Sequence, residues 1–149
     1  MSYNKLRLGR TSITRQIYLV TAVTTQRRRI FEDLYCGRLV VNALRELDYD
    51  QYTRTLAFVV MPDHVHWLFE LLPNNTLAKA LNLFKGRSSR RLNQLLATSG
   101  HIWQPSFHDH AVRTEESLVE TARYVIMNPV RAGLVGRIDS YPLWDCIWV

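Results

Sequence analysis

MPDHVHWLFEL, residues 61–71, predicts a strand that carries two histidines on one face. Because side chains alternate along a strand, His64 and His66 point one way and Trp67 points the other. The preceding segment YTRTLAFVVM, residues 52–61, predicts a second strand, and the Pro-Asp pair between the two favours a tight antiparallel hairpin. Two imidazoles spaced in this way can converge on one divalent cation, although they can equally make hydrogen bonds at a sheet surface.

The segments around this hairpin predict an α+β fold. Residues 15–25 are rich in β-branched residues and predict a strand, and residues 99–114 predict a loop that leads into a short fourth strand. Apolar residues at helical spacing predict helices over residues 31–47, 73–97 and 115–134. The order strand, helix, paired strands, helix, strand, helix implies a ferredoxin-like antiparallel sheet with packed helices.

The composition is that of a globular protein, with 47% hydrophobic and 21% charged residues. We expect one domain over residues 1–149. The chain has no apolar run long enough to cross a bilayer, and residues 1–16 lack the apolar stretch of a secretion signal, so we expect a cytoplasmic protein without a membrane partner. Cys36 and Cys146 form no CxxC pattern and are expected to be small core residues.

The positive charge is clustered and favours a nucleic-acid partner. The net charge is +6, and Arg and Lys gather in TTQRRRIF, residues 24–31, and KGRSSRRLN, residues 85–93. On a helical projection Lys79, Arg87 and Arg90 fall opposite Leu81, which predicts a basic side for solvent or phosphate. A basic surface without a ligand is the simpler alternative.

The last predicted helix carries a tyrosine on its polar side. Its apolar residues form one arc, and the same projection places Tyr124 and Asn128 opposite that arc, one turn apart. Spacing alone favours a surface aromatic followed by a helix cap. Combined with His64 and His66, however, the pair can form a site, because two imidazoles and an amide oxygen can hold Mg²⁺ or Mn²⁺ with open positions for a substrate phosphate. A phenol beside such an ion can attack the phosphorus and form a phosphotyrosine.

A second His-x-His pair competes for the role of metal site. His108 and His110 repeat the spacing of the first pair, next to the last predicted helix. Their position away from the hairpin favours a structural or DNA-contacting role over metal binding.

Four segments in this order resemble the REP-associated tyrosine transposases: MPDHVHWLFEL, FKGRSSRRLN, WQPSFHDHAVRTEE and YVIMNPVRAGLV. These bacterial proteins are relatives of the small insertion-sequence transposases that have an HUH motif and one catalytic tyrosine. The resemblance covers residues 15–148 and implies the HUH endonuclease fold. It also implies Mg²⁺-dependent cleavage and rejoining of single-stranded DNA near palindromic hairpins, at the nucleoid, by a monomer or a homodimer.

The resemblance also implies roles for individual residues. The HUH pair falls on His64 and His66, the nucleophile on Tyr124, and the third metal ligand on Asn128, where some relatives have Gln. The basic helix and the arginine run after the first strand would bind the DNA backbone through Lys79, Lys85, Arg87, Arg90, Arg91, Arg27, Arg28 and Arg29.

Two other functions stay open at this point. A noncatalytic protein that binds hairpin DNA or RNA would use the same basic helix and would be indifferent to a chelator. A metal-dependent nuclease that activates water would cut DNA without a covalent adduct and would tolerate the loss of the Tyr124 hydroxyl.

Overall fold

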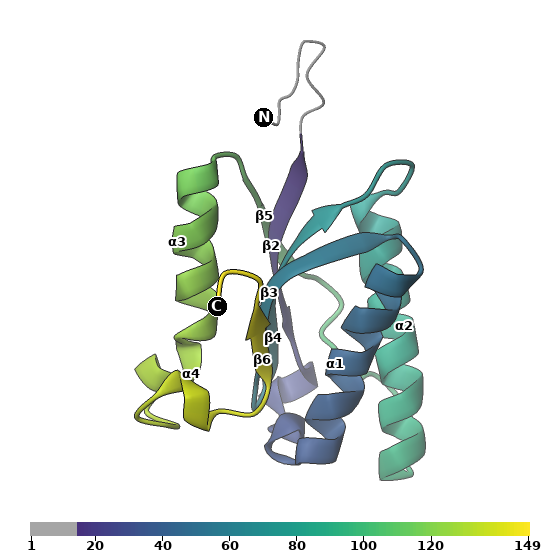
Figure 1. The fold of residues 1–149 in the computed structure, drawn as a ribbon. Coiled ribbons are helices and arrows are strands. Elements are labelled where there is room, and N and C mark those ends of the chain that lie inside the picture. Colours follow the sequence, from purple (N-terminus) through teal and green to yellow (C-terminus); the bar gives the residue numbers. More distant parts are fainter. Residues whose placement is uncertain (1–14) are drawn as a thin grey trace.

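A computed structural model describes residues 15–149, and an antiparallel sheet of five strands forms its centre (Figure 1). Residues 1–14, which we expected in the same domain and without a secretion signal, lie outside the described residues. The sheet order is β5-β2-β4-β3-β6. The strands are β2 (Gln16–Val23), β3 (Thr53–Met61), β4 (His64–Leu71), β5 (His108–Val112) and β6 (Trp144–Cys146). The antiparallel sheet and its helices confirm the predicted α+β class, and the four longer strands have the ferredoxin-like order.

The predicted hairpin is present and sets the register of the central strands. Met61 on β3 lies opposite His64 on β4, so Pro62 and Asp63 alone form the turn. On its other side β4 pairs with β2, where Thr21 lies opposite His66. This register fixes which side chains surround each histidine.

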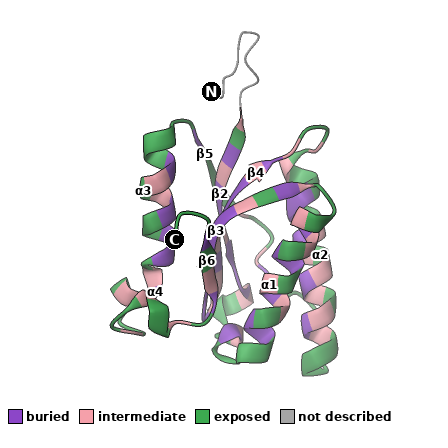
Figure 2. Ribbon diagram, viewed as in Figure 1, coloured by how far each residue is buried: buried purple, intermediate pink, exposed green. Residues whose placement is uncertain are grey.

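Helices α1 (Leu34–Tyr49) and α2 (Leu77–Leu96) cover one face of the sheet (Figure 1). Asp33 begins α1 by accepting hydrogen bonds from two backbone amides, and Thr76 begins α2 in the same way with one. The core between these helices and the sheet contains Trp67, Phe69 and Phe84, and its residues are buried (Figure 2). The first predicted helix, residues 31–47, thus starts three residues late, after a short 3₁₀ turn at Ile30–Glu32.

Helix α3 (Glu115–Ile126) covers the opposite face of the sheet, which is also the face of the two histidines. Its apolar arc packs on Leu19, Val59 and Leu68. The single helix expected over residues 115–134 is wrong, because α3 ends at Ile126 and a short helix α4 (Asn128–Arg131) follows. Pro129 explains the break, since proline lacks the amide hydrogen of a helix interior and favours a first turn.

The C-terminal segment adds a strand that the sequence pattern did not predict. After the 3₁₀ turn Ile138–Ser140, β6 pairs with the outer edge of β3, and the Tyr141 hydroxyl donates to the Val60 carbonyl at 2.6 Å. Leu143 packs against Gly37 on α1 so closely that a Cβ at position 37 would collide with it. The half-buried Trp144 on β6 packs against the core on the α3 face of the sheet.

Both cysteines are buried and unpaired, as expected, and burial raises the pKa of each thiol. None of the helices within residues 15–149 combines the length and the apolar composition that a membrane span needs.

Candidate active site

Each of the two histidines on β4 is fixed through its Nδ1 atom. Nδ1 of His66 lies 2.9 Å from the hydroxyl oxygen of Thr21, and Nδ1 of His64 lies 2.6 Å from a carboxylate oxygen of Asp63. The two rings are nearly perpendicular, with centroids 4.8 Å apart. Within the described part of the chain, no hydrogen bond uses either Nε2 atom. Histidine ligands of metals have this arrangement, with one nitrogen oriented by a neighbour and the other free to coordinate.

Asp63 connects this pair to the arginine run that follows β2. Its second carboxylate oxygen accepts a hydrogen bond from Arg27 at 2.9 Å. Burial alone would raise the pKa of the Asp63 carboxyl, but the hydrogen bonds with His64 and Arg27 outweigh burial and hold that pKa below its ordinary value. Asp63 therefore stays ionised and orients His64.

His66 is partly buried. Burial, together with the neighbouring His64 and Arg131, lowers the pKa of His66 from 6.5 to about 4. The imidazole is therefore neutral at pH 7, which is the form that binds a cation.

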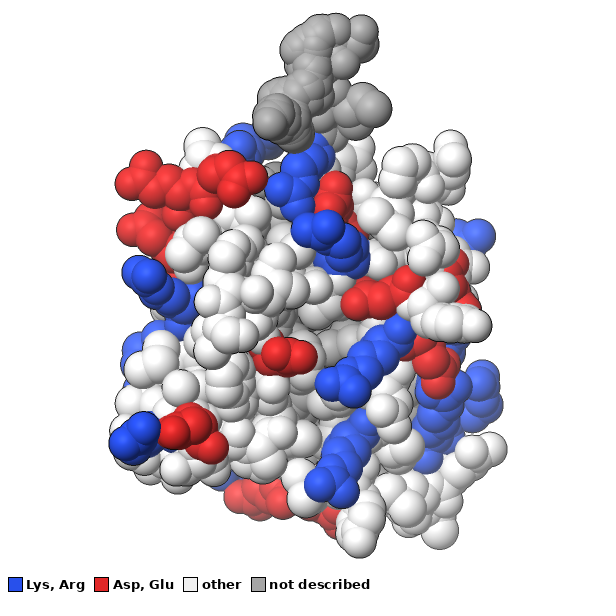
Figure 3. All heavy atoms as spheres, in the orientation of Figure 1, with Lys and Arg blue, Asp and Glu red and all other residues white. Residues whose placement is uncertain are grey.

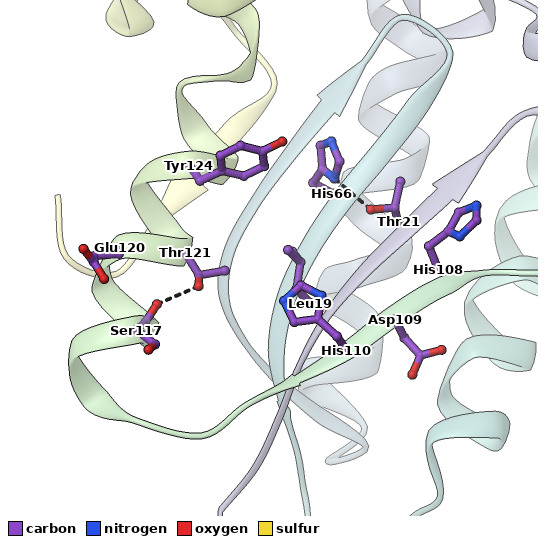
Figure 4. A pocket seen from close by; sticks show the side chains of 10 residues that line it. All are labelled: Leu19, Thr21, His66, His108, Asp109, His110, Ser117, Glu120, Thr121 and Tyr124. Carbon is purple, nitrogen blue, oxygen red and sulfur yellow. Dashed lines mark hydrogen bonds between the residues drawn. The ribbon is translucent and has the colours of Figure 1, made fainter.

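Tyr124 on α3 lies beside the histidines. Its ring centroid is 6.5 Å from that of His66, and Figure 4 shows its hydroxyl end directed toward the strand that carries His66. The side chain is 54% exposed, and its hydroxyl makes no hydrogen bond to any residue between 15 and 149. Helix α3 thus brings an accessible phenol to the histidine face of the sheet.

Arg131 is a residue of this site that the sequence did not point to. Its guanidinium lies over the Tyr124 ring, with Cζ 4.1 Å from the centroid, and its Nη2 donates to the Tyr124 carbonyl at 2.6 Å. Seven residues separate the two positions, which is about two helical turns. Positions seven apart share one face of a helix, so this spacing was the signal that could have pointed to Arg131.

Asn128 occupies the junction between α3 and α4. Its side-chain nitrogen donates to the carbonyls of Tyr124 and Val125 at 3.2 and 3.0 Å, which satisfies the end of α3. No hydrogen bond joins Asn128 to either histidine in the described part, and its Oδ1 accepts none there. The predicted cap at the start of the second helix is wrong, because Asn128 is the first residue of α4 and its amide instead binds the carbonyl end of α3. Its Oδ1 remains available for a ligand.

The rival pair His108 and His110 lies on the edge strand β5, on the same face as His66. Thr21 on β2 pairs with His108 on one side and with His66 on the other. A groove of about 590 Å³ runs between β5 and α3, and its lining includes both histidines of this pair together with His66 and Tyr124 (Figure 4).

The predicted DNA-binding residues divide into two regions. Arg27 lies beside the site through Asp63, whereas Arg28 donates to the His101 carbonyl and Arg29 pairs with Glu32. All of α2 lies on the other face of the sheet, away from Tyr124. The structure therefore brings the histidines, Tyr124, Asn128 and Arg27 to one region and places the basic helix elsewhere.

Several of the basic side chains on α2 already have partners within the protein. Arg91 makes two hydrogen bonds to Glu46, and Arg87 pairs with Asp50. Figure 3 shows acidic and basic side chains next to each other on the side of the molecule where α1 and α2 lie. The Lys85 ammonium donates to the carbonyls of Gln104 and Pro105, and burial lowers its pKa. The remaining members of the predicted set, Lys79 and Arg90, are exposed and in no ion pair with residues 15–149.

No group of three or more His, Cys, Asp or Glu side chains within residues 15–149 is placed to hold a metal ion. A site at His64 and His66 would therefore take its third protein ligand from another residue type, and the amide oxygen of Asn128 is such a donor.

Known proteins resemble this chain in sequence. A REP-associated tyrosine transposase of Escherichia coli K12 is 27% identical over 107 residues, which are 70% of this chain and 61% of that protein. A Haemophilus influenzae protein with a provisional assignment as a REP-associated tyrosine transposase is 29% identical over 98 residues. These residues are 59% of this chain and 56% of the Haemophilus protein. The matches thus span about three fifths of these relatives.

Solved structures share the fold. A REP-associated tyrosine transposase bound to a REP hairpin superposes with a TM-score of 0.72 at 21% identity, over 93% of this chain and 81% of that one. A Deinococcus radiodurans protein described as a transposase gives a TM-score of 0.60 at 24% identity, over 80% and 95% of the two chains. These likenesses confirm the HUH fold that the resemblance implied. The model of the family described as "Transposase IS200 like" matches residues 12–128, and the chain belongs to that family.

Proposed function

We propose that this protein cleaves and rejoins single-stranded DNA beside palindromic hairpins of the REP type, with Tyr124 as the nucleophile. The name of the Escherichia coli relative and the REP hairpin bound to the solved neighbour support this substrate class. The membership of the chain in the IS200-like transposases supports the reaction type.

The observation that carries the proposal is the position of Tyr124. Its phenol is exposed, has no hydrogen-bond partner for its hydroxyl among residues 15–149, and lies beside His66 on the neighbouring strand. A structural tyrosine would be expected to use its hydroxyl or bury its ring. An accessible phenol next to two oriented imidazoles instead suits nucleophilic attack.

The donor set at His64 and His66 fits a divalent cation. Both Nδ1 atoms are engaged by oxygen atoms of neighbouring side chains, so both Nε2 atoms are left for coordination, and the low pKa of His66 keeps that ring neutral. The Oδ1 atom of Asn128 would complete the protein ligands. Bound Mg²⁺ or Mn²⁺ would polarise the scissile phosphate as a Lewis acid.

The proposed reaction exchanges one phosphoester bond for another, so the bond energy is kept in the link between Tyr124 and the DNA. The Tyr124 oxygen forms a bond to phosphorus and loses its proton to solvent, while the bond from phosphorus to the 3′ oxygen breaks and that oxygen gains a proton. The product is a 5′-phosphotyrosine and a free 3′ hydroxyl. A second 3′ hydroxyl can attack the phosphotyrosine and reverse the step, so rejoining needs no nucleoside triphosphate. In keeping with this, the sequence has no G-x-x-x-x-G-K motif of the kind that binds such a nucleotide.

The test is a search for a covalent adduct that resists denaturing detergent. Labelled single-stranded DNA that carries a REP-type hairpin is incubated with the protein in Mg²⁺, in Mn²⁺ or in chelator. We expect a metal-dependent adduct that Tyr124→Phe abolishes. The matched control is Tyr49→Phe, which removes a hydroxyl from a tyrosine that is 86% exposed on α1, and it should leave the adduct unchanged.

Other outcomes would favour the two alternative functions. Metal-dependent cleavage that survives Tyr124→Phe and leaves no adduct would indicate a nuclease that uses water. Hairpin binding that is insensitive to chelator, with no cleavage in any metal, would indicate a noncatalytic binding protein.

A further inference from the structure

Apart from His66 and Tyr124, the residues that line the groove between β5 and α3 have no part in the proposed cleavage step. Its volume of about 590 Å³ lies in the range of sites that bind small ligands. One end is formed by His66 and Tyr124, and the other by the edge strand β5 (Figure 4). Whatever occupies the groove therefore lies directly beside the proposed nucleophile.

The pairing of the strands gives the groove its length. His108, Thr21 and His66 are neighbours across three adjacent strands and project from the same face of the sheet. At about 4.8 Å per strand, the backbones of His108 and His66 are roughly 10 Å apart. A group attached to a phosphate at Tyr124 can therefore extend over Thr21 toward His108.

The groove offers polar groups that the protein itself leaves unused. Neither imidazole of His108 and His110 makes a hydrogen bond or an ion pair with residues 15–149, and both side chains are exposed. The same holds for the carboxylate of Glu120. Leu19 adds an apolar surface between these polar groups.

This lining suits a nucleobase better than an ion. The carboxylate of Glu120 repels a bare phosphate but accepts hydrogen bonds from the exocyclic amino groups of bases. Imidazole rings both stack on bases and exchange hydrogen bonds with their edges.

We infer that this groove binds the base of a nucleotide next to the cleaved phosphate. His108 and His110 contact that base from β5, and Thr121 on α3 forms the opposite wall. The inference rests on the proposed function, since it takes the scissile phosphate to lie at Tyr124. The groove would contact the single strand that flanks the hairpin, and this contact is separate from any contact to the hairpin itself.

Binding of a bare hairpin and of an extended hairpin tests this inference. The probes are a REP-type DNA hairpin alone and the same hairpin with a single-stranded extension on its 5′ or its 3′ side. The variants are Thr121→Trp, which fills the groove, and His110→Ala, which removes one wall with little risk to folding. The matched control is Asn82→Trp, at an exposed position on α2 on the other face of the sheet.

We expect one of the extensions to tighten binding to the unmodified protein about tenfold, the size of one base stacking contact. Both groove variants should lose this gain and bind the bare hairpin as before, and Asn82→Trp should keep it. Replacing the base beside the cleavage point by an abasic site should cause the same loss in the unmodified protein and no further loss in Thr121→Trp. The inference is overturned if neither extension tightens binding, or if both groove variants retain the gain.

The failure of this inference can be distinguished from a failure of the proposed function. An adduct at Tyr124, together with groove variants that bind extended hairpins normally, would remove the base site and leave the cleavage reaction intact. A gain in affinity that depends on the groove, without any adduct in the unmodified protein, would support a binding site for single strands and refute cleavage.

Discussion

The guanidinium of Arg131 lies over the ring of Tyr124, and the same group donates a hydrogen bond to the Tyr124 carbonyl. This contact joins α4 to the last turn of α3 across the break that Pro129 introduces. It fixes the exposed phenol, whose ring centroid is 6.5 Å from that of His66. A positive charge is thereby fixed at the place where the proposed reaction brings a phosphate.

Arg131→Met should slow adduct formation about fivefold to tenfold, which corresponds to about 1 kcal/mol for a partly exposed cation–π contact. Arg131→Lys keeps the charge and should recover part of the rate. The single-turnover rate of adduct formation measures the effect, and affinity for the bare hairpin serves as the control. An unchanged rate in Arg131→Met would show that Arg131 only ends the helix.

Thr21→Val should raise the Mn²⁺ concentration that half-saturates adduct formation by about tenfold to a hundredfold. The substitution keeps the shape of the side chain but removes the oxygen that orients His66, and losses of this size follow when the partner of a metal-binding histidine is removed. Thr25→Val is the matched control, because the Thr25 hydroxyl is buried without a partner among the described residues. Equal Mn²⁺ requirements in the two variants would argue against His66 as a ligand.

Glu46→Gln should lower the free energy of unfolding at pH 7 by less than about 1 kcal/mol, since solvent screens the partly exposed ion pair with Arg91. The hydrogen bond from Arg91 holds the pKa of Glu46 below its ordinary value of 4.5. Because the carboxyl titrates at a lower pH in the folded state, its contribution is complete above about pH 5 and disappears as the pH falls through the lowered pKa. Denaturant titrations should therefore give the unmodified protein and Glu46→Gln different free energies of unfolding at neutral pH and equal ones at strongly acidic pH. An equal difference at both values would contradict the assigned pair.

Arg90→Gln should reduce the slope of log affinity against log salt by about one, whereas Arg91→Gln should leave that slope unchanged. Arg90 is exposed and free of ion pairs with residues 15–149, but the guanidinium of Arg91 is bound to Glu46. Hairpin affinity measured over a range of salt concentrations gives the two slopes. A slope that Arg90→Gln leaves unchanged would mean that Arg90 does not contact a DNA phosphate.

The sequence was sufficient to predict the local features of the site. Strand alternation placed His64 and His66 on one face, and the Pro-Asp pair located the hairpin turn, because both depend on neighbouring residues only. The helical projection likewise placed Tyr124 opposite the apolar arc of α3.

Other features depend on tertiary structure and could not be predicted from periodicity. A helical pattern shows which side of α2 is apolar but not which face of the sheet it covers, so the separation of its basic residues from Tyr124 was not foreseeable. Strand β6 has three residues, too few for a recognisable alternation. The contact of Arg131 with Tyr124 joins the separate helices α3 and α4, whereas the apolar spacing predicted one helix over residues 115–134.

The most direct measurement is the identification of the residue that carries the DNA. The adduct formed in Mn²⁺ is digested with nuclease and protease, and the peptide that bears a nucleotide phosphate is sequenced by mass spectrometry. We predict a single modified peptide, with the phosphate on Tyr124. A phosphate on Tyr35 or Tyr49, which are more exposed and lie on α1, would contradict the proposed site, as would DNA cleavage without any modified peptide.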